Sequence, residues 1–165
     1  MFELKKLSRA GIDGALEKVE RYRLLNEPRE AESICRDVLE VDPDNQRARV
    51  SLILSLTDRF RAEGGPSPAD VLALIPKLET DYARAYYTGI VHERVAKARL
   101  ARGNPGSGSI AYDALRSAME CYDRAHELSV HGDDSALLRW NTCARLLNAN
   151  PSLAPAPETE PTLLE

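Results

Sequence analysis

The sequence predicts an all-helical protein, and three observations support that class. Apolar residues recur three and four positions apart along most of the 165-residue chain, as they do on one face of a helix. No segment alternates apolar and polar residues as a half-buried strand does. Aromatic residues make up only 5% of the chain, which favours helices joined by small and aliphatic side chains.

Two helices are predicted between residues 12 and 41. The earlier one carries an apolar stripe that begins at Ala15. The later one carries a stripe that begins at Ala31, with Asn26 as its expected cap and Pro28 in its first turn. This helix is expected to end before Pro43, because the residue preceding a proline is pushed out of the helical region.

The next helix is marked by an apolar stripe from Ala48 and is expected to end near Arg61, before a Gly-Gly-Pro sequence. Ser67 and Asp70 then have the spacing of a capping box, which predicts a short helix. Pro76 is expected to kink or end that helix, because a proline inside a helix removes a backbone hydrogen bond.

The second half of the chain predicts three more helices. One long helix is expected over residues 82–102, followed by a flexible Gly/Ser-rich loop over residues 103–109. A helix then extends to residue 128, and a last one covers about residues 135–148. Residues 150–165 are rich in proline and glutamate and are expected to be disordered. The predicted organisation is a lead-in over residues 1–11, a helical domain over 12–149 and this tail.

Residues 12–45 form a unit of 34 residues with a recognisable pattern. A tetratricopeptide repeat has a first-helix aromatic residue, a tightly packed alanine, a bulky second-helix residue, a further small or apolar contact and a terminating proline, and these positions hold Tyr22, Ala31, Cys35, Val38 and Pro43. The segment therefore resembles the tetratricopeptide-repeat (TPR) family.

The resemblance extends over about residues 12–148. Gly89 stands at the position where two helices of a repeat approach most closely, and Ala118, Tyr122 and Ala125 follow the second-helix pattern. Trp140 opens a pattern similar to the start of a further repeat. The resemblance implies a right-handed α-solenoid of about three helical hairpins plus a C-terminal capping helix.

In the TPR family the first helices line a concave groove that receives peptides or other proteins. Carried onto this sequence, the resemblance implies nine principal groove residues: Glu20, Leu54, Tyr86, Ile90, Arg94, Lys97, Asn141, Arg145 and Asn148. A wider set adds Glu17, Arg23, Val50, Thr57 and Glu93. Tyr87 and Trp140 are interpreted as packing residues. The family's clamp for a terminal carboxylate uses lysine and asparagine in the first unit, where this chain has acidic residues, so chaperone-tail binding is not supported.

No group of residues predicts catalysis, a metal or a cofactor. The three cysteines, Cys35, Cys121 and Cys143, are too far apart in the sequence for a Cys-x2-Cys motif and lie on or beside apolar stripes. The histidines do not form a His-Glu-x2-His motif. The glycine-rich loop lacks the Lys-Ser/Thr ending of a phosphate-binding loop and follows a predicted helix instead of a strand.

Charge is unevenly distributed along the chain. The net charge is −4, yet residues 12–45 carry five basic against ten acidic residues and residues 82–102 carry five against one. The overall acidity argues against a nucleic-acid partner. A basic, partly aromatic helix suits an acidic protein segment, although a solvated amphipathic helix is the equal alternative.

The leading hypothesis is a cytoplasmic adaptor without catalysis that binds a protein or peptide in the groove. The start of the chain has an early acid and no apolar run, which predicts no signal peptide, and no run is long enough for a membrane span. Two alternatives stay open: a structural subunit that assembles with itself, and a chaperone for an extended client segment.

Overall fold

The computed structural model describes residues 2–156 and confirms the all-helical class. Within that range there are seven α-helices, two short 3-10 helices and no strand. None of these helices combines the length and the apolar character needed to cross a membrane. The elements are, in order, η1 (Arg9–Gly11), α1 (Ile12–Leu24), α2 (Pro28–Val41), α3 (Gln46–Asp58), α4 (Pro68–Leu72), η2 (Ile75–Lys77), α5 (Asp81–Arg102), α6 (Ser107–Leu128) and α7 (Ser135–Ala149).

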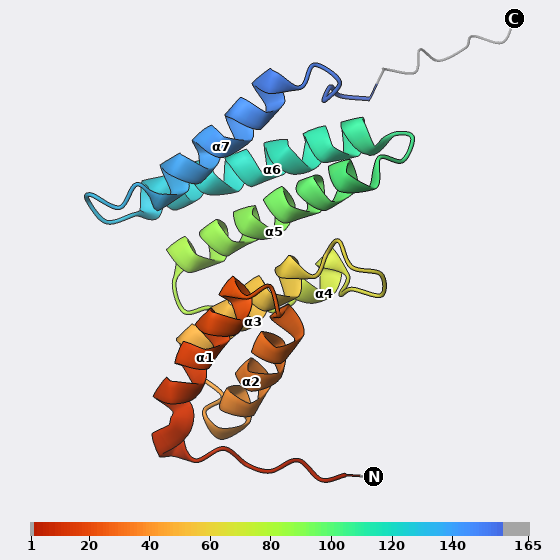
Figure 1. The fold of residues 1–165 in the computed structure, drawn as a ribbon. Helices are drawn as coiled ribbons and strands as arrows, with labels where there is room; N and C mark the ends of the chain where they lie inside the picture. The colour runs from red at the N-terminus through yellow and green to blue at the C-terminus, as the bar shows by residue number, and fades with distance from the viewer. Residues whose placement is uncertain (1, 157–165) are drawn as a thin grey trace, which may run out of the picture.

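Helices that follow one another in the chain mostly lie beside one another in space (Figure 1). α2 packs between α1 and α3, and the short α4 lies next to α3 and α5. α5 and α6 form a long pair with the most extensive contact in the molecule, and α7 lies along α6. α5 also contacts α3, so it joins the first half of the chain to the second.

Local residues set several helix boundaries, and those at Pro28, Asp42-Pro43 and Ser67 lie where the sequence predicts them. α2 begins at Pro28 and ends at Val41, one residue before the Asp-Pro pair. The Ser67 hydroxyl accepts a hydrogen bond from the Asp70 N–H at 3.1 Å, and Thr80 caps α5 by accepting from the Ala83 N–H at the same distance. These bonds satisfy donors that have no partner inside the helix.

Asn26 does not cap α2, contrary to the prediction. Its φ of 60° is in the left-handed region, which asparagine tolerates better than most residues. The Glu27 N–H donates to the Tyr22 carbonyl at 2.8 Å and the Asn26 N–H to the Arg23 carbonyl at 3.1 Å. These are the two bonds of a Schellman motif, so Asn26 ends α1 instead of starting α2.

α3 ends at Asp58, three residues before the predicted end near Arg61. The Arg59 and Phe60 N–H groups donate to carbonyls only three residues back, at 3.1 and 3.2 Å. The last turn therefore tightens into 3-10 geometry and the helix stops. This early end leaves Asp58 at the edge of the helix, where its side chain reaches α1 and α5.

The glycine-rich segment is a shorter loop than predicted. α6 already begins at Ser107, so only residues 103–106 connect α5 to α6, with Gly103 and Gly106 at positive φ of 64° and 78°. Gly108 lies inside α6, where the chain after α7 passes so closely that a Cβ would be 2.7 Å from the Ser152 carbonyl oxygen.

The first part of the segment expected to be disordered carries a buried side chain. Leu153 is 6% exposed and packs into the core between α5, α6 and α7. Burial of this side chain holds residues 150–156 against the helices although their composition is rich in proline. Residues 157–165, to which the same prediction applied, lie outside the described range.

The core has one large cluster of buried side chains among α1 to α5 and another among α5, α6 and α7. Tyr87 of α5 packs against both, which agrees with its interpretation as a packing residue. Gly89 faces the ring of Tyr122, and a Cβ there would come 2.6 Å from the Tyr122 Cε1 atom. The close approach of two helices at Gly89 is thereby confirmed.

Candidate functional site

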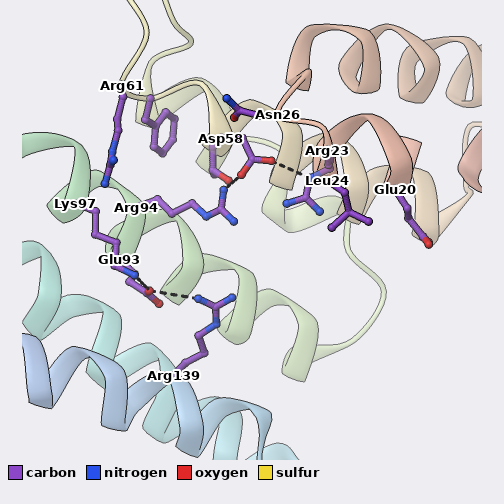
Figure 2. Close-up of a pocket in the computed structure, with 12 residues that line it drawn as sticks. Glu20, Arg23, Leu24, Asn26, Asp58, Arg61, Glu93, Arg94, Lys97 and Arg139 are labelled. Carbon is purple, nitrogen blue, oxygen red and sulfur yellow. Dashed lines mark hydrogen bonds and ion pairs between the residues drawn. The ribbon is translucent and has the colours of Figure 1, made fainter. Parts of the chain in front are cut away.

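A cleft of about 690 Å³ opens between α1, α3, α5 and α7 (Figure 2). None of its lining residues belongs to α2, α4 or α6. The residues from α1 and the turn after it are Glu20, Arg23, Leu24 and Asn26, and those from α3 and the turn after it are Thr57, Asp58, Phe60 and Arg61. α5 contributes Glu93, Arg94 and Lys97, and α7 contributes Arg139.

Asp58 holds two arginines from different helices on one wall of the cleft. Its Oδ2 atom accepts a hydrogen bond from Arg23 Nε at 2.8 Å, and its Oδ1 atom pairs with Arg94 Nη1. All three side chains are less than a quarter exposed. One carboxylate is therefore shared by two guanidinium groups.

Burial lowers the pKa of both arginines. Desolvation lowers the pKa of Arg23. It also lowers the pKa of Arg94 to about 10, and the like charges of Arg23 and Arg139 add to the effect. Both groups remain charged at neutral pH, but Arg94 lies where positive charge is concentrated.

Glu93 is a second carboxylate that pairs with two cations. Its side chain is 1% exposed, and its Oε1 atom accepts hydrogen bonds from Lys97 Nζ at 2.5 Å and from Arg139 Nη1 at 3.3 Å. Its Oε2 atom accepts from the Tyr122 hydroxyl at 2.7 Å. A buried carboxylate is costly unless it is paired and hydrogen-bonded, and these three donors meet that need. Burial and the Glu93 charge together raise the pKa of Tyr122.

The cleft carries an excess of positive charge. Five cationic side chains line it against three carboxylates, and Glu20 is also paired with Arg47, outside the cleft, at 2.7 Å. Asp58 and Glu93 are each divided between two cations. Arg61 forms no ion pair with any residue in the described range 2–156.

Chemically, the arrangement is suited to binding an anion. No cysteine or histidine lines the cleft, and residues 2–156 contain no group of three or more His, Cys, Asp or Glu placed to hold a metal. Cys35 and Cys143 are buried elsewhere, and burial raises the pKa of each thiol to about 12. Positive charge and guanidinium N–H donors are what the cleft offers a ligand.

Three of the nine principal residues expected in a groove line this cleft, namely Glu20, Arg94 and Lys97. Arg23, Thr57 and Glu93, from the wider set, line it as well.

Of three others, one lies in the core and two pack against it. Ile90 is 1% exposed and is not available to a ligand. Leu54 and Tyr86 are half-buried and pack against the same cluster. Leu54 belongs to α3, and Ile90 belongs to α5, on the same face as Arg94. The part of this face around Ile90 is therefore buried by packing, whereas Arg94 lines the cleft.

The α7 residues expected in a groove lie elsewhere. Asn141 lines a separate cavity of about 280 Å³ between α6 and α7, beside the half-buried Trp140. Arg145 and Asn148 are exposed and are not part of the cleft. The residue that α7 does contribute is Arg139, which lies nearer the start of that helix.

Sequence reasoning missed Asp58, Arg61 and Arg139, together with the neutral lining residues Leu24, Asn26 and Phe60. One pattern in the sequence pointed toward them. Glu93 is the one acidic residue beside five basic ones in residues 82–102. A single acidic residue in such a segment indicates an ion pair with nearby cations. Comparisons of the chain with protein-family models, with curated proteins and with solved structures found no match.

Proposed function

We propose that the protein is a non-catalytic, cytoplasmic adaptor that binds an acidic segment of another protein in the cleft. The observation that carries the proposal is the charge of the cleft, where five cations face three carboxylates. A cleft lined by one predominant charge concentrates field lines and attracts ligands of the opposite charge.

The origin of the lining residues supports the same proposal. They come from α1, α3, α5 and α7 and from the turns after α1 and α3. In the TPR-like arrangement that we propose, α1–α2, α3–α4 and α5–α6 are the hairpins of a right-handed solenoid and α7 is its cap. The cleft then corresponds to the concave groove formed by first helices.

The mouth of the cleft also offers an apolar contact. Leu24 lines it and is 88% exposed, and Leu25, which follows, is 60% exposed. A partner segment that places an aliphatic residue beside its acidic ones would cover Leu24 while its carboxylates meet the arginines. Burial of such a side chain adds about 1.5–3 kcal/mol when it is complete.

Binding of labelled peptides to the full chain, followed by fluorescence anisotropy, tests the proposal. One peptide is composed of glutamate and leucine, and its control has lysine in place of glutamate. We expect the acidic peptide alone to bind, and to bind more weakly as salt is raised to about 150 mM, because exposed charges are screened. Equal binding of the two peptides would contradict the proposal.

Two variants with the same charge change sharpen this test. Arg61→Ala removes a cleft cation that has no ion pair in residues 2–156, and Arg99→Ala removes an exposed cation of α5 outside the cleft. We expect Arg61→Ala to weaken binding of the acidic peptide about threefold and Arg99→Ala to leave it unchanged. Equal effects would mean that the cleft is not the binding site.

A second candidate, self-assembly, is favoured by a group of exposed apolar side chains around the α6–α7 connection. These residues are Leu128, Val130, Leu137 and Leu138. Light scattering over a range of concentrations tests this candidate, with Leu138→Glu as the variant expected to prevent association. A monomer at every concentration would remove it.

A further inference from the structure

Three arginines from three helices converge on the cleft. Arg23 and Arg94 meet at the two oxygens of Asp58, and Arg139 reaches Glu93, the residue next to Arg94. Figure 2 shows their guanidinium groups directed into the space between α1, α5 and α7. Lys97 adds a fourth positive charge through its contact with Glu93.

These guanidinium groups retain donors for a ligand. A guanidinium has five N–H bonds, and in the ion pairs each arginine uses a single nitrogen: Nε of Arg23, Nη1 of Arg94 and Nη1 of Arg139. Asp58 and Glu93 thus fix the positions of the arginines without occupying their whole donor sets. Within residues 2–156 the one buried polar side-chain atom without a partner is Arg59 Nε, so each remaining nitrogen of the three arginines either reaches solvent or already has a partner, as Arg139 has in Tyr86.

We infer that the cleft binds a phosphoryl group carried by a side chain of the partner segment. This inference rests on the proposed function, because it specifies the anion by which an acidic segment is recognised. The phosphorylated residue would contact Arg23, Arg94 and Arg139, with Asp58 and Glu93 as the residues that position them.

The number of acceptor oxygens and the charge of the ligand both favour a phosphoryl group over a carboxylate. A phosphorylated side chain has three acceptor oxygens and a charge of about −1.5 to −2 at neutral pH, whereas a carboxylate has two oxygens and a single charge. In the complex that we infer, the three guanidinium groups each bond a different oxygen of one phosphoryl group. Its charge also matches the excess of two positive charges among the cleft residues.

The predominance of arginine over lysine in the cleft also favours a phosphoryl group. Four of the five cleft cations are arginines, whose planar forks bind phosphate oxygens with defined geometry. Asp58 and Glu93 repel any anion that enters, so a ligand must contact several cations at once to overcome that repulsion. A dianion does so from one side chain.

One peptide in three versions tests the inference. The peptide is the acidic glutamate–leucine sequence with serine, aspartate or phosphoserine at its centre, and its affinity for the full chain is measured by fluorescence anisotropy. We expect the phosphoserine version to bind at least about tenfold more tightly than the aspartate version. Equal affinity of these two overturns the inference and leaves the proposed function standing, whereas absence of binding by all three overturns both.

The pH dependence provides an independent readout. The second ionisation of a phosphoryl group has a pKa of about 6. Lowering the pH from about 7.5 to about 5.5 should therefore reduce the affinity of the phosphoserine peptide several-fold. The aspartate peptide should change little over the same interval, because its carboxylates ionise near pH 4. Identical pH profiles would contradict recognition of a dianion.

The variants Arg94→Lys and Arg139→Lys distinguish the contribution of positive charge from that of guanidinium geometry. Each keeps the positive charge but loses the fork, so we expect the preference for phosphoserine over aspartate to fall to about threefold or less. Arg99→Lys, outside the cleft, is the matched control and should keep the full preference. Circular dichroism and urea titration of each variant show whether it is folded, and a folded variant with unchanged preference overturns the inference.

Inorganic phosphate, as a competitor, distinguishes a protein segment from a small phosphate as the source of the anion. We expect it to displace the phosphoserine peptide only at concentrations at least about a hundredfold above the dissociation constant of the peptide. Displacement at comparable concentrations would show that the segment contributes no affinity, and would overturn the assignment to a phosphorylated protein.

Discussion

Gly89 in α5 lies directly against the ring of Tyr122 in α6. A Cβ at this position would come 2.6, 2.8 and 3.0 Å from three ring atoms, and the first two distances are shorter than real Cβ contacts. Tyr122 is fully buried and its hydroxyl donates to Glu93, so the ring has little freedom to move. The absence of one side chain therefore sets the distance between the two longest helices.

Gly89→Ala should lower the free energy of unfolding by about 1–3 kcal/mol, because overpacking in a fixed core forces backbone shifts. Gly14→Ala, in the exposed face of α1 with nothing within 4 Å of its Cβ, is the matched control. It should raise stability by about 0.5–1 kcal/mol through helix propensity. Urea denaturation measures both changes, and equal changes would contradict the close contact.

Two buried thiols make the stability of the fold depend on pH in the alkaline range. Burial raises the pKa of Cys35 and of Cys143 from 9.0 to about 12 in the folded protein. The unfolded chain releases these protons at lower pH, so ionisation above pH 9 stabilises the unfolded state. The stability associated with the thiols is complete below pH 9 and is lost as the pH rises toward 12.

We expect urea unfolding at successive pH values from 9 to 11 to show a falling free energy, by up to about 1.4 kcal/mol per pH unit for each thiol. Other groups titrate in this range, so the comparison is with the double variant Cys35→Ala/Cys143→Ala. That variant should be less stable at pH 8 but show a shallower slope. The same slope in both proteins would mean that the thiols do not contribute.

At the scale of elements, the segment after α7 acts as part of the core. Leu153 is 6% exposed among residues of α5, α6 and α7, and the Ser152 carbonyl approaches Gly108 of α6. α7 has one neighbouring helix with extensive contact, α6. The turn formed by residues 150–156 therefore adds a second attachment for the end of the domain.

Leu153→Ala should lower the free energy of unfolding by about 2–3 kcal/mol, since it removes a buried leucine side chain. Leu4→Ala makes the same chemical change at a residue that is 89% exposed, and it should alter stability by less than about 0.5 kcal/mol. Thermal or urea unfolding measures the difference. If both variants unfolded together with wild type, the segment would not contribute to the fold.

At the scale of the whole molecule, Asp58 ties together elements from both halves of the chain. It lies at the end of α3, binds Arg23 of α1 and pairs with Arg94 of α5. Arg102 adds a further link, donating to the Phe60 carbonyl at 3.0 Å. These polar contacts supplement the limited packing between α3 and α5.

Asp58→Asn removes the shared charge and should have two opposite effects. The free energy of unfolding should fall by about 3 kcal/mol or more, because Arg23 and Arg94 are left facing each other without compensation. Affinity for the acidic peptide should rise, because the cleft loses one of its carboxylates. Asp44→Asn, at a side chain that is 95% exposed in its pair with Arg49, should change neither property appreciably.

The sequence by itself determined the helical class and most helix boundaries. These depend on residues close together in the chain: Pro28 starts α2, the Asp-Pro pair ends it after Val41, and Ser67 caps α4 by bonding the Asp70 N–H. The resemblance to the TPR pattern also implied the close contact at Gly89, and the reason is steric, because a residue without a side chain lets two helices approach.

Only the tertiary structure decided the composition of the cleft. Glu93 and Arg139 are 46 positions apart and Arg23 and Asp58 are 35 apart, so no local pattern pairs them. Ile90 and Arg94 share a face of α5 by spacing, yet the first is buried and the second lines the cleft. Helical periodicity defines a face, whereas the packing of neighbouring helices determines which part of that face meets solvent.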